Sequence, residues 1–583
     1  MKLKSSSLPT RSKSVWIQIA LVLILLLAFG LRVYRLGSQG LWADEMQTSA
    51  LARFPFGVMF ETLLSHRVHV PLYFLVMRLW VWVGTAEFAL RFFSLVWGVA
   101  AVALVYRLGK EMAQEGAGLI AALLLAASPF HIWFSQEARM YTLVATSVLA
   151  ASVFLVRLLR RDAWTDWVGY GACMLVAVYT HYLAVLVLVA HYVLFSLHYR
   201  LLRPIFAKWL VTAGLVGALF SVWFALILIT GGFTQSAIAW IAPAHWYEPV
   251  LTLSAFSGAS SSDLSQPSVY LPSVVSLSAL GLVVLSLRRV RPPVNAPVGM
   301  LPEPASPEQI GYHLQPRLLL AWLFVPLLLT WLISLDLPVP NKRSIYMDRY
   351  LIIVMPAFVA LVGIGLWTLY RRWRGAALAM LAIAVAGNAL ALRNMYVEPA
   401  YAREDWRAAM YYLRDGREPD DILILRPSQT LPLAYYGDPS WPYEEFPFLF
   451  LEEERQTFLD TEMPERMTAI AREWDRAWLV TSVDNINPHG FPEARNDALA
   501  RAHESDAIKG WLDAHYTMLS EVRFTGIRLT LYDLRKAQER ANEGRYRASR
   551  AGSFQFRGPC SEEQGGPSEG CTMAHSTTPG KMS

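Results

Sequence analysis

Apolar runs of membrane-spanning length recur from residue 15 to residue 393, and short polar connections separate them. A helix needs about 20 apolar residues to cross the hydrocarbon core of a bilayer. The pattern therefore predicts a polytopic α-helical membrane protein with about 11 transmembrane helices. The expected spans are 15–34, 86–107, 116–129, 141–158, 166–180, 181–199, 209–230, 270–287, 317–335, 350–370 and 375–393.

The pattern changes after residue 393. Segments 421–425, 476–481 and 527–532 have the apolar or alternating pattern of strands, and segments 403–414 and 494–514 have that of helices. Residues 394–545 are therefore expected to form an extracytoplasmic α/β domain. The tail 546–583 is polar and rich in Gly and Pro, which favours disorder. Residues 1–14 form a basic, cytoplasmic N-terminus, and the apolar run after them lacks a cleavage site, as in a retained signal anchor.

Composition and charge agree with a membrane protein. Of 583 residues, 54% are hydrophobic and only 17% are charged, whereas soluble domains carry about 25% charged residues. The net charge is +6, with the basic excess before residue 394 and an acidic excess in 394–545. The basic excess therefore belongs to the membrane half, and no nucleic-acid partner is needed to explain it.

Clusters of Arg and Lys orient the spans. They lie at 157–161, at 200–208, at 288–291 together with Arg317, and at 371–374. With the spans above, all four fall on the side of the basic N-terminus, which the positive-inside rule makes cytoplasmic. Segment 70–84 is too short for a span, and counting it as one would move every cluster outside. Residues 37–85 are therefore expected to form one outer loop with at least one helix lying on the membrane surface.

The outer loops of this topology hold the unusual side chains. Charge near the membrane is costly, so such residues are candidates for function. The first loop contains Leu41-Trp42-Ala43-Asp44-Glu45 and, later, His69-Val70-Pro71-Leu72-Tyr73; the second contains Ser135-Gln136-Glu137-Ala138-Arg139-Met140-Tyr141. His181 begins another span, and Lys342, Arg343, Asp348, Arg349 and Tyr350 precede a further one.

This mixture of side chains suits one chemical task. Arg and Lys hold phosphate oxygens, a nearby carboxylate accepts a proton from an attacking group, and aromatic rings line a sugar or lipid site. Each residue also has an ordinary interpretation. Asp44 and Glu45 could cap a helix, Arg139 could lie at the headgroup level, Glu137 could pair with an Arg, and the histidines and aromatic residues could be interfacial. Their joint occurrence on one face favours a site.

These stretches resemble the C-type membrane glycosyltransferases. The closest resemblance is to the bacterial branch similar to protein O-mannosyltransferases, glycosyltransferase family 39, and to the lipid A aminoarabinose transferase. The matching motifs occur in the expected order over residues 30–390. Of these, the Asp44-Glu45 pair is the most specific, and the run 135–141 is nearly as specific.

The resemblance implies an enzyme that uses a polyprenyl-phosphate-linked sugar on the extracytoplasmic side of a bacterial inner membrane, with inversion at the anomeric carbon. The acceptor is expected to be a lipid, a glycan or a protein. Asp44 matches the catalytic carboxylate and is expected to act as general base, with Glu45 as the weaker partner. The positions expected to bind the donor phosphate are Arg139, Arg349, Lys342 and Arg343. The positions expected in the substrate pocket are Trp42, His69, Tyr73, Glu137, Tyr141, His181 and Tyr350.

No cofactor is required for this chemistry, because the donor phosphate is already a competent leaving group. A divalent metal stays open, since some relatives use one and Asp44, Glu45 and Glu137 offer oxygen ligands. Two rival functions also stay open. A transporter or lipid flippase would usually have internal repeats and charges at mid-membrane depth, and the sequence has no evident repeat. A membrane-anchored binding protein would carry its function in residues 394–545.

Overall fold

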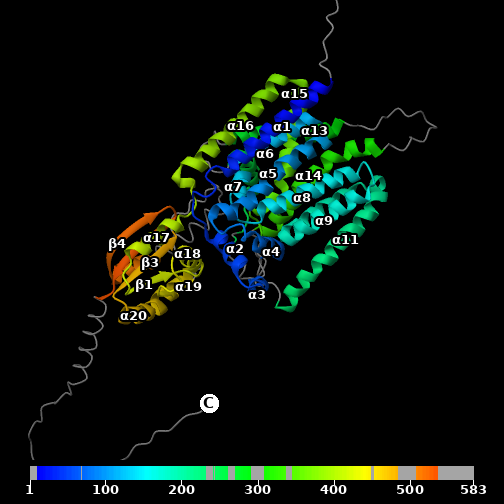
Figure 1. Cartoon of the computed structure of the whole chain (residues 1–583). Helices are drawn as coiled ribbons and strands as arrows, with labels where there is room; N and C mark the ends of the chain where they lie inside the picture. The colour runs from blue at the N-terminus through cyan, green and yellow to red at the C-terminus, as the bar shows by residue number, and fades with distance from the viewer. Residues whose placement is uncertain are drawn as a thin grey trace, which may run out of the picture.

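The computed structural model describes residues 10–66, 69–231, 241, 243–259, 270–289, 307–335, 344–447, 452–482 and 507–535. These residues form a large helical bundle with a small α/β unit beside one end of it (Figure 1). Lys342, Arg343 and the tail 546–583 lie outside the described residues, so the predictions made for them stay predictions.

The bundle has a helix at each of the eleven expected spans, but the expected number of spans is not confirmed. By length and composition, seven of the described helices can cross a membrane. An eighth span is possible if α6 and α7 (Pro129–Ser135), which meet at a bend of 62°, form one broken span. The helices at the expected positions are α1 (Thr10–Val33), α5 (Glu87–Met112), α6 (Glu115–Ala126), α8 (Tyr141–Leu158), α9 (Trp164–Thr180), α10 (Val185–Leu197), α11 (Tyr199–Ile229), α13 (Leu271–Arg289), α14 (Pro307–Ser334), α15 (Met355–Arg372) and α16 (Arg374–Val397).

The centre of the bundle is formed by α8 and by the span that includes α15, which are 83% and 89% buried. The spans of α1 and α11 are only 11% and 17% buried, so their apolar surfaces are available to lipid. Close contact between α5 and α6 depends on glycine. A Cβ on Gly109 would lie 2.7 Å from the Cα of Gly118, so only small residues allow this approach.

The first outer loop folds into three short helices, α2 (Ala43–Arg53), α3 (Phe56–His66) and α4 (Pro71–Trp80). They lie at the end of the bundle that is next to the α/β unit (Figure 1). At the other end of α5, Glu111 pairs with Arg160 at 2.6 Å. Arg91, also on α5, pairs with Glu45 of the first outer loop. Arg91 and Glu111 are separated along α5 by about 30 Å at 1.5 Å per residue, which is the thickness of a hydrocarbon core. The first outer loop and the basic connection at Arg160 therefore lie at opposite ends of the bundle.

The α/β unit contains a five-stranded mixed sheet in the order β2-β1-β3-β5-β4. β1 is parallel to β2 and β3, whereas β5 is antiparallel to β3 and β4. The pattern missed β2 because it has three residues, and missed β4 because it is an exposed edge strand without clear alternation. Of the expected helix 494–514, residues 494–506 lie outside the described residues and 507–514 are helical. The elements are α17 (Trp406–Gly416), β1 (Asp421–Leu425), α18 (Thr430–Tyr436), β2 (Tyr443–Glu445), α19 (Glu452–Thr457), α20 (Met463–Glu473), β3 (Arg476–Ser482), β4 (Thr517–Phe524) and β5 (Ile527–Asp533).

Polar contacts join the α/β unit to the first outer loop. The Tyr436 hydroxyl accepts a hydrogen bond from the Leu41 amide at 2.7 Å and donates one to Glu87 at 3.0 Å. Arg407 on α17 pairs with the same Glu87 at 3.1 Å. The Tyr435 hydroxyl donates to the carbonyl of Thr85 at 2.7 Å. The unit is thus fixed against the segment that contains the candidate site.

Candidate active site

Asp44 lies in the first turn of α2, with its side chain 30% exposed. Its Oδ2 is 3.7 Å from Arg139 Nη2 and 3.9 Å from Arg349 Nη1. These distances are longer than hydrogen bonds, so the carboxylate is held by charge while Oδ2 can still accept a proton or a hydrogen bond. The sequence prediction that these three residues share a site is consistent with this geometry.

The two arginines are held in different ways. Arg139 is 3% exposed, and its Nη1 donates to the Asp44 carbonyl at 3.2 Å and to Thr48 Oγ1 at 3.4 Å. Among the described residues, Arg139 Nε has no hydrogen-bond partner. The Arg349 guanidinium lies 5.9 Å from the Trp42 ring and 5.4 Å from the Tyr350 ring. Two buried or partly buried cations therefore face one carboxylate.

An aromatic wall continues from Arg349. The ring centroids of His181 and Tyr350 are 5.0 Å apart, and Tyr141 lies 6.5 Å from His181 and 6.4 Å from Tyr350. Tyr141 begins α8, His181 follows α9, and Tyr350 begins the 3-10 turn Tyr350–Val354. Three segments distant in the sequence thus place the expected pocket residues side by side.

Glu137 is a buried acid next to this group. It is 1% exposed, and its Oε1 has no hydrogen-bond partner among the described residues. Burial raises the pKa of Glu137 to about 7, while the nearby charges of Arg403 and Arg349 oppose the rise. Glu137 therefore changes its charge near neutral pH, within a site that contains several arginines.

Glu45 differs from its neighbour Asp44 because it is fully buried. Its Oε1 accepts from Arg91 Nε at 2.8 Å and from the Ala138 amide at 2.8 Å. Its Oε2 accepts from Arg91 Nη2 at 2.6 Å and lies 3.1 Å from Arg403 Nη1. Burial alone would raise the pKa of Glu45, but Arg91 and Arg403 outweigh it and lower the pKa to about 2. Glu45 also accepts from the Trp42 amide at 3.4 Å, as a helix-capping acid does.

His69 precedes α4, and Tyr73 lies in the first turn of α4. His69 Nε2 is 3.4 Å from Gln47 Oε1, and its ring lies 5.1 Å from that of Phe74. Tyr73 is fully buried, with its ring 5.5 Å from Phe74. It is close enough to Arg139 to interact electrostatically. Tyr73 is therefore buried within electrostatic reach of the site, and His69 lies beside α2.

Comparison with known proteins gives a consistent result. Residues 68–227 match the family model described as dolichyl-phosphate-mannose-protein mannosyltransferase, and no curated protein matches the chain in sequence. The fold resembles ArnT from Cupriavidus metallidurans bound to undecaprenyl phosphate, with 13% identity, a TM-score of 0.52, and coverage of 89% of this chain and 98% of ArnT. The chain thus resembles the C-type membrane glycosyltransferases in its matched segment and in its fold. It also resembles the oligosaccharyltransferase AglB from Archaeoglobus fulgidus, in complex with an inhibitory peptide and a dolichol-phosphate, with 11% identity, a TM-score of 0.50, and coverage of 88% and 74%.

The matched segment 68–227 includes Glu137, Arg139, Tyr141 and His181 but neither Asp44 nor Arg349. The assignment of Asp44 therefore depends on its sequence motif and on its geometry. The resemblance found in the sequence is confirmed at the level of the family model and the fold.

Two of the three residues expected to offer metal ligands, Glu45 and Asp44, are paired with guanidinium groups. Both oxygens of Glu45 are held by Arg91, and Asp44 is flanked by two guanidinium groups. Over the described ranges, no group of three or more His, Cys, Asp or Glu side chains converges as a metal site. A divalent ion bound to Asp44 Oδ2 would be repelled by the positive charges of Arg139 and Arg349, which flank that oxygen.

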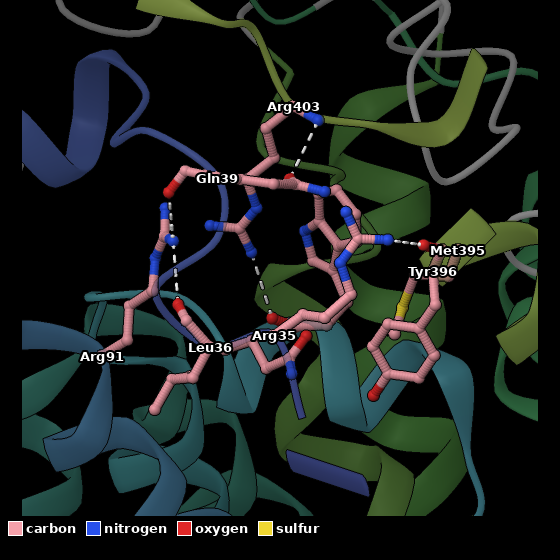
Figure 2. A pocket seen from close by; sticks show the side chains of 9 residues that line it. Arg35, Leu36, Gln39, Arg91, Met395, Tyr396 and Arg403 are labelled. Atoms are coloured by element: carbon pink, nitrogen blue, oxygen red, sulfur yellow. Dashed lines mark hydrogen bonds between the residues drawn. The ribbon is translucent and has the colours of Figure 1, made fainter. Parts of the chain in front are cut away.

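Two arginines of the site were not expected from the sequence. Arg91 lies within a predicted span, and a charge at that depth could have marked it. Arg403 lies in the connection after α16, where nothing in the sequence distinguishes it. Both line one pocket (Figure 2). The residues lining that pocket are Arg35, Leu36, Gln39, Arg91, Trp133, Gln136, Met395, Tyr396 and Arg403.

Proposed function

We propose that the protein transfers a sugar from a polyprenyl-phosphate-linked donor to an acceptor, with inversion at the anomeric carbon. The observation that supports this most strongly is the Asp44 carboxylate between Arg139 and Arg349, at 3.7 and 3.9 Å. A base and two phosphate-binding cations at one end of a membrane bundle are what such a transfer requires. The C-type glycosyltransferase fold supports the same reaction class.

The donor phosphate is proposed to bind at Arg139 and Arg349. Both arginines are largely buried, so their interaction with an anion is screened less than at an exposed surface. The Nε of Arg139, which has no hydrogen-bond partner among the described residues, offers a further donor to a phosphate oxygen. The related structures of ArnT and AglB contain undecaprenyl phosphate and dolichol-phosphate, which supports a lipid phosphate as the donor class.

Transfer is proposed to occur in one displacement. The acceptor hydroxyl or amine gives its proton to Asp44 Oδ2 while its lone pair forms a bond to the anomeric carbon. The bond from that carbon to the phosphate oxygen breaks on the opposite face, and the electron pair leaves with the polyprenyl phosphate. Arg139 and Arg349 stabilise the charge that develops on the leaving phosphate. Attack opposite to the leaving group inverts the anomeric carbon.

Glu137 is proposed to make donor binding depend on pH. The donor phosphate is a diester and keeps one negative charge throughout the neutral range. Ionised Glu137 repels that charge, whereas protonated Glu137 does not. Because the pKa of Glu137 is about 7, we expect the donor KM to rise as pH increases through 7.

The site is proposed to face the extracytoplasmic side of a bacterial inner membrane. The basic connection at Arg160 lies at the opposite end of α5, and the positive-inside rule makes that end cytoplasmic. The α/β unit then lies outside with the site, where a lipid, glycan or protein acceptor is available. A flippase would use charges at mid-membrane depth, whereas the charged groups of this site lie at helix ends.

Glycoconjugate analysis tests this function. Mass spectrometry of lipids, glycans and proteins from cells with and without the gene should show one conjugate that loses a sugar. A plasmid carrying the wild-type chain should restore the sugar, and one carrying Asp44→Asn should not, although both proteins are present in the membrane. Unchanged conjugates in the deletion strain, or full restoration by Asp44→Asn, would contradict the proposal.

A further inference from the structure

Arg403 lies between the two parts of the molecule. It follows α16 and the short turn Pro399–Tyr401, and two residues separate it from the start of α17 in the α/β unit. The amide of Asp405, the N-cap of α17, donates to the carbonyl of Thr525 at 3.0 Å, which fixes this segment to the turn between β4 and β5. A displacement of the unit would therefore move Arg403.

The Arg403 side chain enters the bundle instead of facing solvent, with 6% exposed. Figure 2 shows it in the pocket beside Arg91 and Gln39. Its Nη2 donates to the Trp133 carbonyl at 3.3 Å, and its guanidinium lies 4.4 Å from the centre of the Trp133 ring. Its own amide donates to Gln39 Oε1 at 3.2 Å. The residue thus contacts the segment after α1 and the end of α7.

The third contact leads toward the candidate site. Arg403 Nη1 lies 3.1 Å from Glu45 Oε2, and Glu45 Oε1 accepts from the Ala138 amide at 2.8 Å. Ala138 lies between Glu137 and Arg139. A continuous chain of polar contacts therefore runs from the α/β unit to the residues that flank the proposed phosphate site. Asp44 is the neighbour of Glu45 on the same helical turn.

We propose that Arg403 is a positioning residue for sugar transfer, through which the α/β unit becomes a structural part of the active site. The proposal rests on the proposed function. Arg403 holds Glu45 and Trp133, and these two hold the turn 136–140 and the start of α2. Because a misplacement of about 1 Å can cost a reaction about a hundredfold, this support affects the rate without contact to the substrate.

Arg403 also affects the charge of Glu137. Charged or titratable groups from several segments act on Glu137. They are Arg403, Arg349, Asp44 and Glu45 of α2, Tyr73 of α4, and the sequence neighbours Arg139 and Tyr141. The positive charge of Arg403 opposes the rise that burial causes in the pKa of Glu137. A neutral side chain at position 403 would therefore raise that pKa further, which a purely mechanical role would not do.

Three variants of the full-length protein test the proposal. Arg403→Gln removes the charge, and Arg403→Lys keeps it. Arg407→Gln is the matched control, because Arg407 joins the same unit to Glu87 at 3.1 Å and lies 31% exposed. Transfer kinetics are measured in liposomes between about pH 5.5 and 9, with a polyprenyl-phosphate sugar as donor. The pH dependence of thermal unfolding is measured in parallel, since it reads the titration of Glu137 without any activity.

The expected result is specific to Arg403. Arg403→Gln should lower kcat about tenfold or more and should move the pH at which the donor KM rises upward by about one unit. In Arg403→Lys, the pH at which the donor KM rises should stay at its wild-type value. Arg407→Gln should change kcat by no more than about threefold and should leave that pH unchanged. If Arg403→Gln does not fold, an unchanged pH in Arg403→Lys supports the proposal and a shifted pH overturns it.

Other outcomes separate the two claims. Wild-type kcat and an unmoved pH in Arg403→Gln overturn the positioning role, as do equal effects in Arg407→Gln. If the wild-type protein transfers no sugar from any donor, the proposed function fails instead. In that case the pH dependence of thermal unfolding still tests the link between Arg403 and Glu137. A pH dependence in Arg403→Gln that matches the wild type overturns the link, and one that is shifted supports it.

Discussion

Glu45→Gln tests the packing that holds the active site together. The substitution keeps the size of the side chain but removes its charge. In the wild-type protein, the Glu45 carboxylate accepts two hydrogen bonds from Arg91, at 2.8 and 2.6 Å, and lies 3.1 Å from Arg403. A glutamine would offer one oxygen, and its NH₂ group would face a guanidinium donor. Two buried cations would then lack their counter-charge.

Two independent arguments give the magnitude. Removing one partner of a buried ion pair costs about 3–5 kcal/mol. The pKa of Glu45 is lowered from 4.5 to about 2, and at about 1.4 kcal/mol per pKa unit this corresponds to about 3 kcal/mol. Because the pKa is lowered in the folded protein, this stabilisation is present above pH 4.5 and is lost as pH falls toward 2. Glu45→Gln should therefore unfold more easily at pH 7, with a difference that shrinks below pH 4.5.

Reversible unfolding by SDS in mixed micelles, followed by tryptophan fluorescence, measures the free energy of unfolding. Glu115→Gln is the control, because its pair with Lys110 at 2.7 Å is about 40% exposed on both sides. Such a pair contributes at most about 1 kcal/mol. The reasoning is refuted if Glu45→Gln lies within about 1 kcal/mol of the wild type, or if its difference is the same at pH 7 and at pH 3.

Three further predictions concern charge, donor binding and packing. Glu137→Gln should increase stability above pH 7. The pKa of Glu137 is raised to about 7, so the stabilising protonated form of the acid is lost as pH rises through 7. Thermal unfolding between pH 5 and 9 would contradict this if the variant and the wild type did not diverge. Arg349→Ala should raise the donor KM about tenfold or more, since a hydrogen bond to a charged group contributes about 1.5–3 kcal/mol; initial rates against donor concentration measure it, and an unchanged KM would exclude Arg349 from the phosphate site. Gly118→Ala should destabilise the folded protein by about 1–3 kcal/mol, because the added Cβ would lie 2.5 Å from the Tyr106 carbonyl oxygen. Gly281→Ala is the control and should be close to neutral, because a Cβ there would meet nothing within 4 Å. Equal unfolding midpoints for the two variants would show that α5 and α6 are not in close contact.

The sequence pattern predicted the positions of the bundle helices because membrane-spanning segments are defined by length and apolar character, which are local properties. It did not predict which helices are too short to span. Short helices such as α10 and α6 have the same apolar composition as spans, and Pro129 breaks the α6–α7 pair after only twelve residues of α6. The strands of the α/β unit were predictable where they are buried, as in β1, and not at the exposed edge strand β4.

The candidate site was predicted in part. Asp44, Arg139 and Arg349 come from motifs at helix ends, and end positions on one side of a membrane converge in any bundle of this topology. The resemblance ranked Asp44 above Glu45, but the local pattern could not show why, since the two acids are adjacent and only Glu45 is enclosed by its pair with Arg91. Arg403 lies 358 residues from Glu45, and no local pattern encodes a contact at that separation.

Single-turnover transfer by the Asp44→Asn variant tests the central claim most directly. The purified variant is mixed with a radiolabelled polyprenyl-phosphate sugar and acceptor membranes, and donor binding is measured in the same preparation. Loss of a general base should slow transfer about 10²- to 10⁴-fold, whereas donor binding should be unchanged or tighter, because the negative charge beside Arg139 and Arg349 is removed. Transfer within about threefold of the wild-type rate would contradict the assignment of Asp44 as the base.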